Sequence, residues 1–250
     1  PPCFPGGAGS DDAAWLLAVR MSPRAVVRVV TDPAANTYAA TRPVSGPAPD
    51  APWAVHLADE AGYHSWMCFD LDASHGNVSA DAKRLRRWLG MLGIPHLECL
   101  SGPTGGRHFW MSVEHLNPTG IRRIGLLARE LLPTLDLPSL TDRGAGAVRP
   151  PYAPHRLGGR SEPLGDVDVL FQAPALTAAA ADELLALLDA EGATLPTPAT
   201  AGIRGMVLDR HGIPHLQGPP RTPSARIQRL LEHGDPAIGD ASLLQATVLA

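Results

Sequence analysis

Lysine, paired cysteines and long apolar runs are scarce or absent in this chain of 250 residues. Lys83 is the only lysine, so arginine carries almost all of the positive charge. A GC-rich coding sequence is the first explanation of this bias, and selection of guanidinium groups that bind phosphate in a forked geometry is the second. No run of about 18 apolar residues occurs, which argues against a membrane span. No basic region followed by an apolar stretch marks a signal peptide.

The cysteines and the net charge narrow the class of protein further. Cys3, Cys68 and Cys99 are widely spaced and form no Cys-x-x-Cys pair, which argues against a structural zinc site. An odd number of cysteines without a secretory signal predicts reduced thiols that serve in packing, and a cytoplasmic location. The formal net charge of −4 argues against a uniformly basic surface but leaves room for a local basic groove, which phosphate binding requires.

Composition divides the chain into four segments. Residues 1–10 are rich in proline and glycine and predict a disordered lead-in. Residues 11–190 hold the periodic patterns of a folded domain, and the apolar content of 44% is sufficient for a core. Residues 191–223 predict a linker, and residues 224–250 a small helical accessory region. The last helical pattern stops part-way and the chain opens on proline, so we expect the natural protein to be longer.

Apolar periodicity predicts the main elements of the large domain. Helices are expected over residues 11–20, 79–92, 117–132 and 177–188, and strands over residues 25–30, 66–72, 96–100 and 108–113. Trp15, Leu16 and Val19 are expected on one face of the first helix. Proline, glycine and serine predict a loop over residues 43–52.

The helix expected over residues 79–92 is amphipathic. Ser79 is its predicted N-cap, and Asp81 suits the first turn, where a carboxylate is favourable. Leucine and tryptophan recur at helical spacing on one side, and the basic run of residues 83–87 covers the others. This run is interpreted first as a solvated helix face and second as a DNA contact.

A pair of carboxylates lies at the end of the strand expected over residues 66–72. Period-two geometry places Met67, Phe69 and Leu71 on one face, with Asp70 and Asp72 side by side on the other. Two adjacent carboxylates and substrate phosphates are typical ligands of Mg²⁺. Solvated acids at an exposed strand end are the simpler explanation, but the apolar flank favours acids that have a partner.

A glycine-rich turn, Ser101-Gly102-Pro103-Thr104-Gly105-Gly106-Arg107-His108, joins the next two strands. Successive backbone N–H groups in such a turn form a concave site that binds anions. Side-chain donors are available from Ser101, Thr104, Arg107 and His108, and the glycines, Gly106 among them, allow the tight backbone conformations of the turn. An ordinary glycine-containing hairpin with an incidental histidine is the alternative.

A third acid, Asp142, precedes a segment rich in proline and basic residues. That segment runs through Arg149-Pro150-Pro151-Tyr152-Ala153-Pro154-His155 to Arg160. Prolines restrict the backbone while the basic side chains offer contacts to phosphate or template. The alternative is a surface loop whose acid pairs with Arg143. Three further acids are candidates for the same role: Asp136, Asp166 and Asp168.

Taken together and in this order, the three segments resemble the archaeo-eukaryotic primase superfamily, in particular the primase–polymerase domains of plasmids, phages and mobile elements. The resemblance covers roughly residues 25–175 and implies an α/β (α+β) fold in which an RRM-like antiparallel sheet carries the acids. It implies that Asp70, Asp72 and Asp142 are catalytic and bind two Mg²⁺ or Mn²⁺ ions. It also implies a nucleotide-binding set of Ser101, Thr104, Gly106, Arg107 and His108, with His155 and Arg160 as further contacts.

The activity that this resemblance implies is DNA-dependent nucleotidyl transfer on a single-stranded DNA template. A 3′-hydroxyl would displace pyrophosphate from a nucleoside triphosphate to make and extend primers. No Gly-x-x-x-x-Gly-Lys-Ser/Thr loop is present, so we expect any helicase to act in trans or to lie in a missing C-terminal part.

Two other functions compete with this one. The first is a catalytically inactive module of the same fold that binds single-stranded nucleic acid. The second is a metal-dependent nuclease of the replication-initiator kind, which needs a His-x-His pair and a nucleophilic tyrosine. The chain has Tyr38, Tyr63 and Tyr152 but no His-x-His pair, so the nuclease ranks below the binding module.

Overall fold

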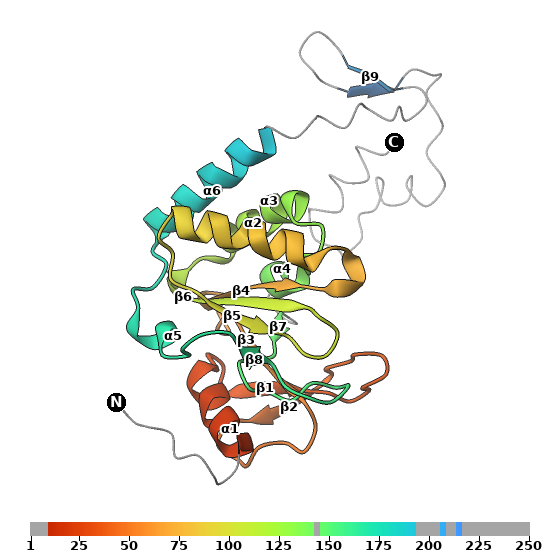
Figure 1. Cartoon of the computed structure of the whole chain (residues 1–250), viewed down its shortest axis with the longest axis vertical. Helices are drawn as coiled ribbons and strands as arrows, with labels where there is room; N and C mark the ends of the chain where they lie inside the picture. Colours follow the sequence, from red (N-terminus) through yellow and green to blue (C-terminus); the bar gives the residue numbers. More distant parts are fainter. Residues whose placement is uncertain (1–9, 143–145, 194–205, 209–213, 217–250) are drawn as a thin grey trace, which may run out of the picture. The chain divides into compact units, whose positions relative to one another are not determined.

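The computed structural model describes residues 10–142, 146–193, 206–208 and 214–216 (Figure 1). The chain divides into two compact units, Pro1–Leu195 and Pro196–Ala250. The elements of the first unit, in chain order, are α1 (Ser10–Met21), β1 (Val26–Val29), β2 (Ala40–Pro43), β3 (Trp53–His56), β4 (His64–Leu71), the 3₁₀ helix η1 (Ala73–His75), α2 (Val78–Met91), β5 (Leu97–Leu100), β6 (Arg107–Leu116), α3 (Pro118–Leu131), α4 (Pro138–Thr141), β7 (Ala147–Val148), β8 (Glu162–Pro163), α5 (Val169–Gln172) and α6 (Ala178–Ala193).

The N-terminal sheet has the strand order β2-β1-β3-β7, and all of its pairs are antiparallel. The valines of β1 alternate in burial, so that Val27 and Val29 face inward. On that face α1 packs against β3, where the rings of Trp15 and Trp53 meet edge to face at 5.5 Å. This packing closes one side of the sheet.

The second sheet has the order β4-β6-β5-β8 and is also antiparallel. Its register places Phe69 opposite Phe109 and Met67 opposite Met111, and all four side chains are buried. Helices α2 and α3 cover this face, and α6 packs against α3 (Figure 1). The opposite face carries the row Asp70, His108 and Cys99, because these residues pair directly across β4, β6 and β5.

Helices α2 and α3 begin at asparagines whose side chains cap the first turn. The Asn77 carboxamide accepts the Ala80 N–H at 3.1 Å, and that of Asn117 accepts the Gly120 N–H at 2.9 Å. The predicted cap at Ser79 is therefore wrong, since Ser79 lies inside α2, which begins at Val78. Proline at the first position of α3 completes that N-terminus, because its missing N–H needs no partner there.

The expected mixed α/β architecture is confirmed, although the first unit has two antiparallel sheets where one was expected. The strands expected over residues 25–30, 66–72, 96–100 and 108–113 are confirmed to within a few residues. In α1 the expected apolar face is partly wrong. Leu16 is 63% exposed, while Ala14, Ala18 and Met21 are buried beside Trp15. The small side chains of Ala14 and Ala18 let the helix pack close to the sheet. The helix therefore turns this face inward, and Leu16 points to solvent.

In the second unit the described residues form a two-stranded antiparallel hairpin, β9 (Met206–Leu208) and β10 (Pro214–Leu216). This hairpin lies within the segment predicted as linker. The lead-in over residues 1–9 and the two helices expected within residues 224–250 lie outside the described residues. Among the helices that the structure describes, none combines the length and apolarity needed to cross a membrane.

Candidate functional site

A hollow of about 450 Å³ opens where the end of β4, the turn after β5 and the segment around residues 149–156 meet, and we call it the β4 hollow. The sequence-predicted residues that line it are Asp70, Asp72, Ser101, Thr104, Gly106 and His155. Asp136, one of the further candidates for the third acid, also lines it, as do residues outside the predicted site set: Asn36, Ser74, Arg149 and Arg156. Asn36 comes from the loop between β1 and β2, so both sheets contribute to the hollow.

Asp70 is held in place by His108. The two residues are direct partners in the β4–β6 ladder, and His108 Nε2 lies 3.4 Å from Asp70 Oδ1. The His108 side chain is 1% exposed and that of Asp70 is 26% exposed, so the histidine lies behind the carboxylate. Burial opposes ionisation of Asp70, but the charge and hydrogen bond of His108, with the charges of Arg149 and His75, outweigh it and lower the pKa of that carboxyl.

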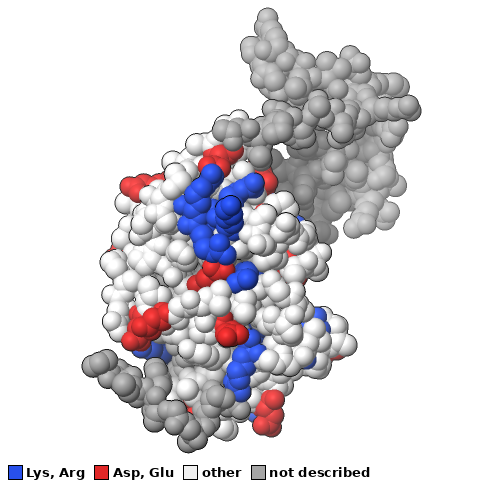
Figure 2. Space-filling view, in the orientation of Figure 1, with Lys and Arg blue, Asp and Glu red and all other residues white. Residues whose placement is uncertain are grey.

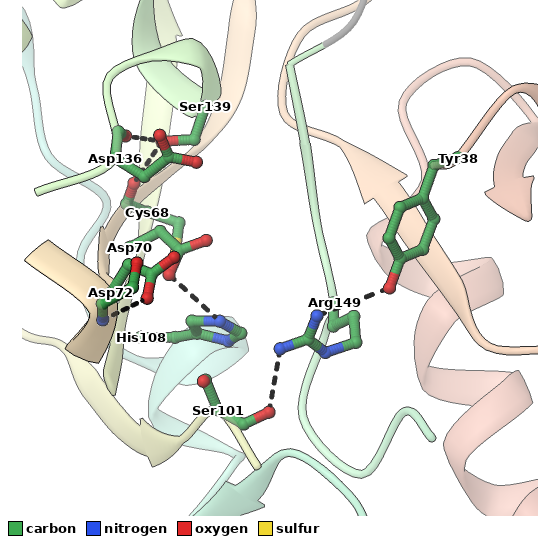
Figure 3. A network of polar contacts seen from close by, with 10 residues as sticks. Tyr38, Cys68, Asp70, Asp72, Ser101, His108, Asp136, Ser139 and Arg149 are labelled. Carbon is green, nitrogen blue, oxygen red and sulfur yellow. Dashed lines mark hydrogen bonds and ion pairs between the residues drawn. The ribbon is translucent and has the colours of Figure 1, made fainter. Parts of the chain in front are cut away.

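Asp136 joins Asp70 and Asp72 through backbone pairing. The Asp136 N–H donates to the Asp70 carbonyl at 2.7 Å, and the Asp72 N–H donates to the Thr134 carbonyl at 2.8 Å. These bonds align the segment after α3 with the end of β4, next to the bridge between Leu71 and Leu135. Figure 3 shows the three carboxylates on the same side of the hollow.

The segment that carries Asp136 is anchored by α2. Buried Asp81 accepts two hydrogen bonds from Thr134, from the backbone N–H at 2.9 Å and from Oγ1 at 2.7 Å. The predicted first-turn position of Asp81 is correct, but the carboxylate serves a distant segment. A buried carboxylate that accepts two bonds fixes its donors firmly, so Asp81 positions Thr134 and with it Asp136.

The three acids fit a divalent cation by their chemistry. Burial raises the pKa of Asp136, and the negative charges of Asp70 and Asp72 raise it further. The positive charges of His75 and Arg129 lower it, but they do not outweigh the other effects. Carboxylate oxygens are the ligands that Mg²⁺ and Mn²⁺ prefer. A cation bound beside them would also relieve the repulsion between their negative charges. In the described part of the chain no group of three or more His, Cys, Asp or Glu side chains forms a ready-made metal site. The carboxylates therefore face the hollow without converging on a single point.

The glycine-rich turn forms the wall next to the acids. The Ser101 N–H donates to the Gly106 carbonyl at 2.9 Å and closes the turn. A Cβ on Gly106 would come within 2.6 Å of Ser101 Oγ and 2.9 Å of the Leu71 carbonyl oxygen, so only glycine fits there. Arg107 does not reach the hollow. Its guanidinium lies on the helical face of the sheet, 3.1 Å from Glu98.

Arg149 forms the opposite wall. Its Nη2 donates to the Ser101 carbonyl at 3.0 Å, and its Nη1 lies 3.4 Å from the Tyr38 hydroxyl (Figure 3). The guanidinium thus joins the second sheet to the β1–β2 loop. Its Nε is buried and has no hydrogen-bond partner among the described residues. A buried N–H without a partner is unusual in proteins, and the charge of its guanidinium lies beside the hollow.

His155 faces the hollow as a neutral ring. Burial lowers its pKa to about 4, with further lowering by the positive charges of Arg149, Arg156 and His108. Its Nδ1 accepts the Leu157 N–H at 3.0 Å, so the neutral ring carries its proton on Nε2. Gly102 provides the space for this ring, because a Cβ there would lie 2.5 Å from His155 Cδ2.

Several predicted residues lie outside the β4 hollow. His108 acts from behind Asp70, and Arg160 donates to the Tyr152 carbonyl at 3.2 Å. Asp142 lines a separate hollow with Arg24, Arg28 and His56 on the N-terminal sheet. The alternative Asp168 precedes α5 and accepts a hydrogen bond from Gln172. Of the acids considered for the third position, the structure brings Asp136 to the hollow. An apolar residue precedes Asp136, as in Leu71-Asp72, but Val167 precedes Asp168 in the same way, so this signal does not single out Asp136.

The hollow around Asp142 contains a histidine that should affect acid stability. His56 is buried, and burial, Arg24 and Arg28 lower its pKa from 6.5 to about 4. Between these values the unfolded chain binds the proton more readily, so stability is expected to fall as the pH decreases from 6.5 to about 4. His56 alone accounts for up to about 3 kcal/mol of that loss. Chemical denaturation at several pH values would show a shallower dependence for His56→Gln, and equal slopes would contradict the assignment.

Comparison with known proteins finds a partial structural similarity. No protein-family model and no curated protein matches the sequence. A solved structure, the polymerase domain of Mycobacterium tuberculosis ligase D in complex with DNA, has a TM-score of 0.42 and 15% sequence identity to this chain. The match covers 73% of this chain and 88% of that chain.

Proposed function

We propose that this protein is a metal-dependent nucleotidyltransferase of the primase–polymerase kind, which makes and extends primers on single-stranded DNA. One observation carries the proposal: three carboxylates, Asp70, Asp72 and Asp136, face Arg149 and His155 across a single hollow. Nucleotidyl transfer needs acids for divalent cations next to basic and backbone donors for a triphosphate, and these groups meet here although they are distant in sequence.

In this proposal each wall of the hollow has its own task. Asp70, Asp72 and Asp136 hold one or two divalent cations, which neutralise phosphate charge and lower the pKa of the attacking hydroxyl. His108 orients the Asp70 carboxylate from behind and keeps it ionised. Positioning by the protein accounts for much of the catalysis in phosphoryl transfer. A fixed orientation of the Asp70 carboxylate is therefore more important for activity than a high basicity of that carboxylate.

The glycine-rich turn, together with the wall opposite the acids, binds the triphosphate. The turn at Ser101–Gly106 presents backbone and hydroxyl donors to the hollow, and glycine at position 106 lets the turn pack against Leu71. Arg149 offers its guanidinium charge, and His155 offers Nε2–H. Because His155 stays neutral, it donates a hydrogen bond without adding a charge that would hold pyrophosphate after the reaction.

The test is synthesis on unprimed and on primed single-stranded DNA with labelled nucleotides and Mg²⁺ or Mn²⁺. Products are expected on at least the primed template, and chelation of the metal with EDTA is expected to abolish them, because uncompensated carboxylates repel the triphosphate. The sugar that is incorporated would show whether the product is DNA or RNA. Products that persist in EDTA would contradict the proposal.

The inactive binding module is the outcome if neither template yields products. In that case the oligonucleotide is expected to bind without divalent metal, and nucleoside triphosphates are expected not to protect the protein against thermal unfolding. Protection by a nucleotide in the presence of Mg²⁺, without synthesis, would instead show an intact nucleotide site that lacks an initiation partner.

A further inference from the structure

A basic surface lies outside the β4 hollow, on helix α2. Four of its side chains, Lys83, Arg84, Arg86 and Arg87, are exposed, and we call them the α2 basic face. Figure 2 shows a group of basic side chains over the helical layer, in the place that α2 occupies in Figure 1. The apolar side of the same helix is buried at Leu85, Trp88 and Leu89, so the basic side chains point away from the core.

The positive charge of this face is only partly compensated within the protein. Arg86 pairs with Glu98 and Arg87 with Glu191, each at 2.7 Å. Arg84 donates to the Leu131 carbonyl, and neither Lys83 nor Arg84 pairs with an acid among the described residues. Exposed ion pairs contribute about 0–1 kcal/mol, so a polyanion can compete for Arg86 and Arg87.

The shape of the face favours an extended polyanion over a protein segment. Lys83, Arg84 and Arg87 line a shallow hollow of about 530 Å³ with Ala80 and Glu191. No aromatic or large apolar side chain lines it, although protein partners are usually anchored by such groups. The guanidinium groups of Arg84 and Arg87 can each donate two hydrogen bonds to a phosphate, and the Lys83 ammonium group adds a third positive charge. Their spacing along the helix suits successive phosphates of a nucleic-acid backbone.

We propose that the α2 basic face binds the phosphodiester backbone of a nucleic-acid strand. Ser74 lines the β4 hollow and α2 begins at Val78, so the chain leads from the wall of the hollow into the helix that carries the face. Lys83 follows about 8 Å along the helix axis from Val78. The binding is electrostatic and independent of sequence, and it does not require the chemistry proposed for the acids.

The test is anisotropy of a fluorescent single-stranded oligonucleotide in EDTA, with the full chain and a salt series. Lys83→Gln/Arg87→Gln is expected to bind the oligonucleotide roughly tenfold more weakly at about 100 mM salt. The negative slope of the logarithm of the association constant against the logarithm of the salt concentration is expected to become shallower by about 1.4, because two phosphate contacts are lost. Lys83→Glu removes no hydrogen bond or ion pair with a described residue. It is expected to weaken binding in the same direction, and it guards against a folding defect in the double variant.

Arg122→Gln/Arg123→Gln is the matched control, because it removes two exposed charges from the neighbouring helix α3. The proposal would be overturned if the double variants of α2 and α3 weakened oligonucleotide binding equally. It would also be overturned if neither the double variant of α2 nor Lys83→Glu weakened binding. Binding of polyglutamate to the face without binding of the oligonucleotide would also overturn it and indicate an acidic protein partner. Asp70→Asn/Asp72→Asn is expected to retain binding, which separates failure of this surface from failure of the proposed catalysis.

Discussion

Asp136→Asn is expected to reduce nucleotide incorporation at least about 100-fold, a loss typical for removal of a group that stabilises charge in a transition state. The variant keeps the size of the side chain and the backbone hydrogen bond from Asp136 to Asp70, so the fold should persist. It removes one of three negative charges that face the hollow and therefore weakens the hold on a divalent cation. Asp70→Asn/Asp72→Asn should lose activity to the same extent or more.

Asp142→Asn is the matched control for this prediction, because Asp142 lies in the separate hollow with Arg24 and Arg28. It is expected to retain activity within about twofold, since distant and independent sites contribute separately. Steady-state incorporation on a primed template, with far-ultraviolet circular dichroism of each variant, measures both effects. Loss of activity in Asp142→Asn with full activity in Asp136→Asn would reverse the assignment of the third acid.

Gly102→Ala is expected to reduce nucleotide binding strongly through displacement of His155. Gly102 has φ of 152°, where a side chain is strained, and its new Cβ would lie 2.5 Å from the imidazole ring. The ring cannot stay in place, so the hollow loses the Nε2 donor and the turn loses its packing. We expect a stability loss of about 1–3 kcal/mol and a rise in the KM for nucleotide of roughly tenfold or more.

Gly105→Ala separates backbone strain from this collision. Gly105 lies in the same turn with φ of 84°, but a Cβ there would meet nothing within 4 Å. It should therefore show the strain in thermal unfolding without the rise in KM. Similar KM values for the two variants would show that His155 does not bind the nucleotide.

The local patterns of the sequence were sufficient to predict most elements of the first unit and one wall of the site. Alternation along residues 66–72 correctly separates buried Met67, Phe69 and Leu71 from Asp70, because a strand with one face against helices must alternate. The turn residues Ser101, Thr104 and Gly106 were predicted from their conformational and donor properties, and they line the hollow.

Contacts between distant segments could not be predicted in the same way. Arg107 and His108 are adjacent in sequence and therefore point to opposite faces of β6, one toward Glu98 and the other toward Asp70. The sequence prediction assigned both to the triphosphate because it did not apply this alternation to β6. Strand pairing and burial place His108 behind Asp70 and Arg107 on the helical side of the sheet.

The choice between Asp136 and Asp142 shows the same limit most clearly. Both acids precede the proline-rich segment, and composition and spacing favour neither. The difference arises from Asp81, since its bonds to Thr134 and the pairing of residues 134–136 with the end of β4 bring Asp136 beside Asp70. Residue chemistry along the chain thus established which groups are available, whereas long-range hydrogen bonds and packing selected which of them meet, because those interactions depend on segments far apart in sequence.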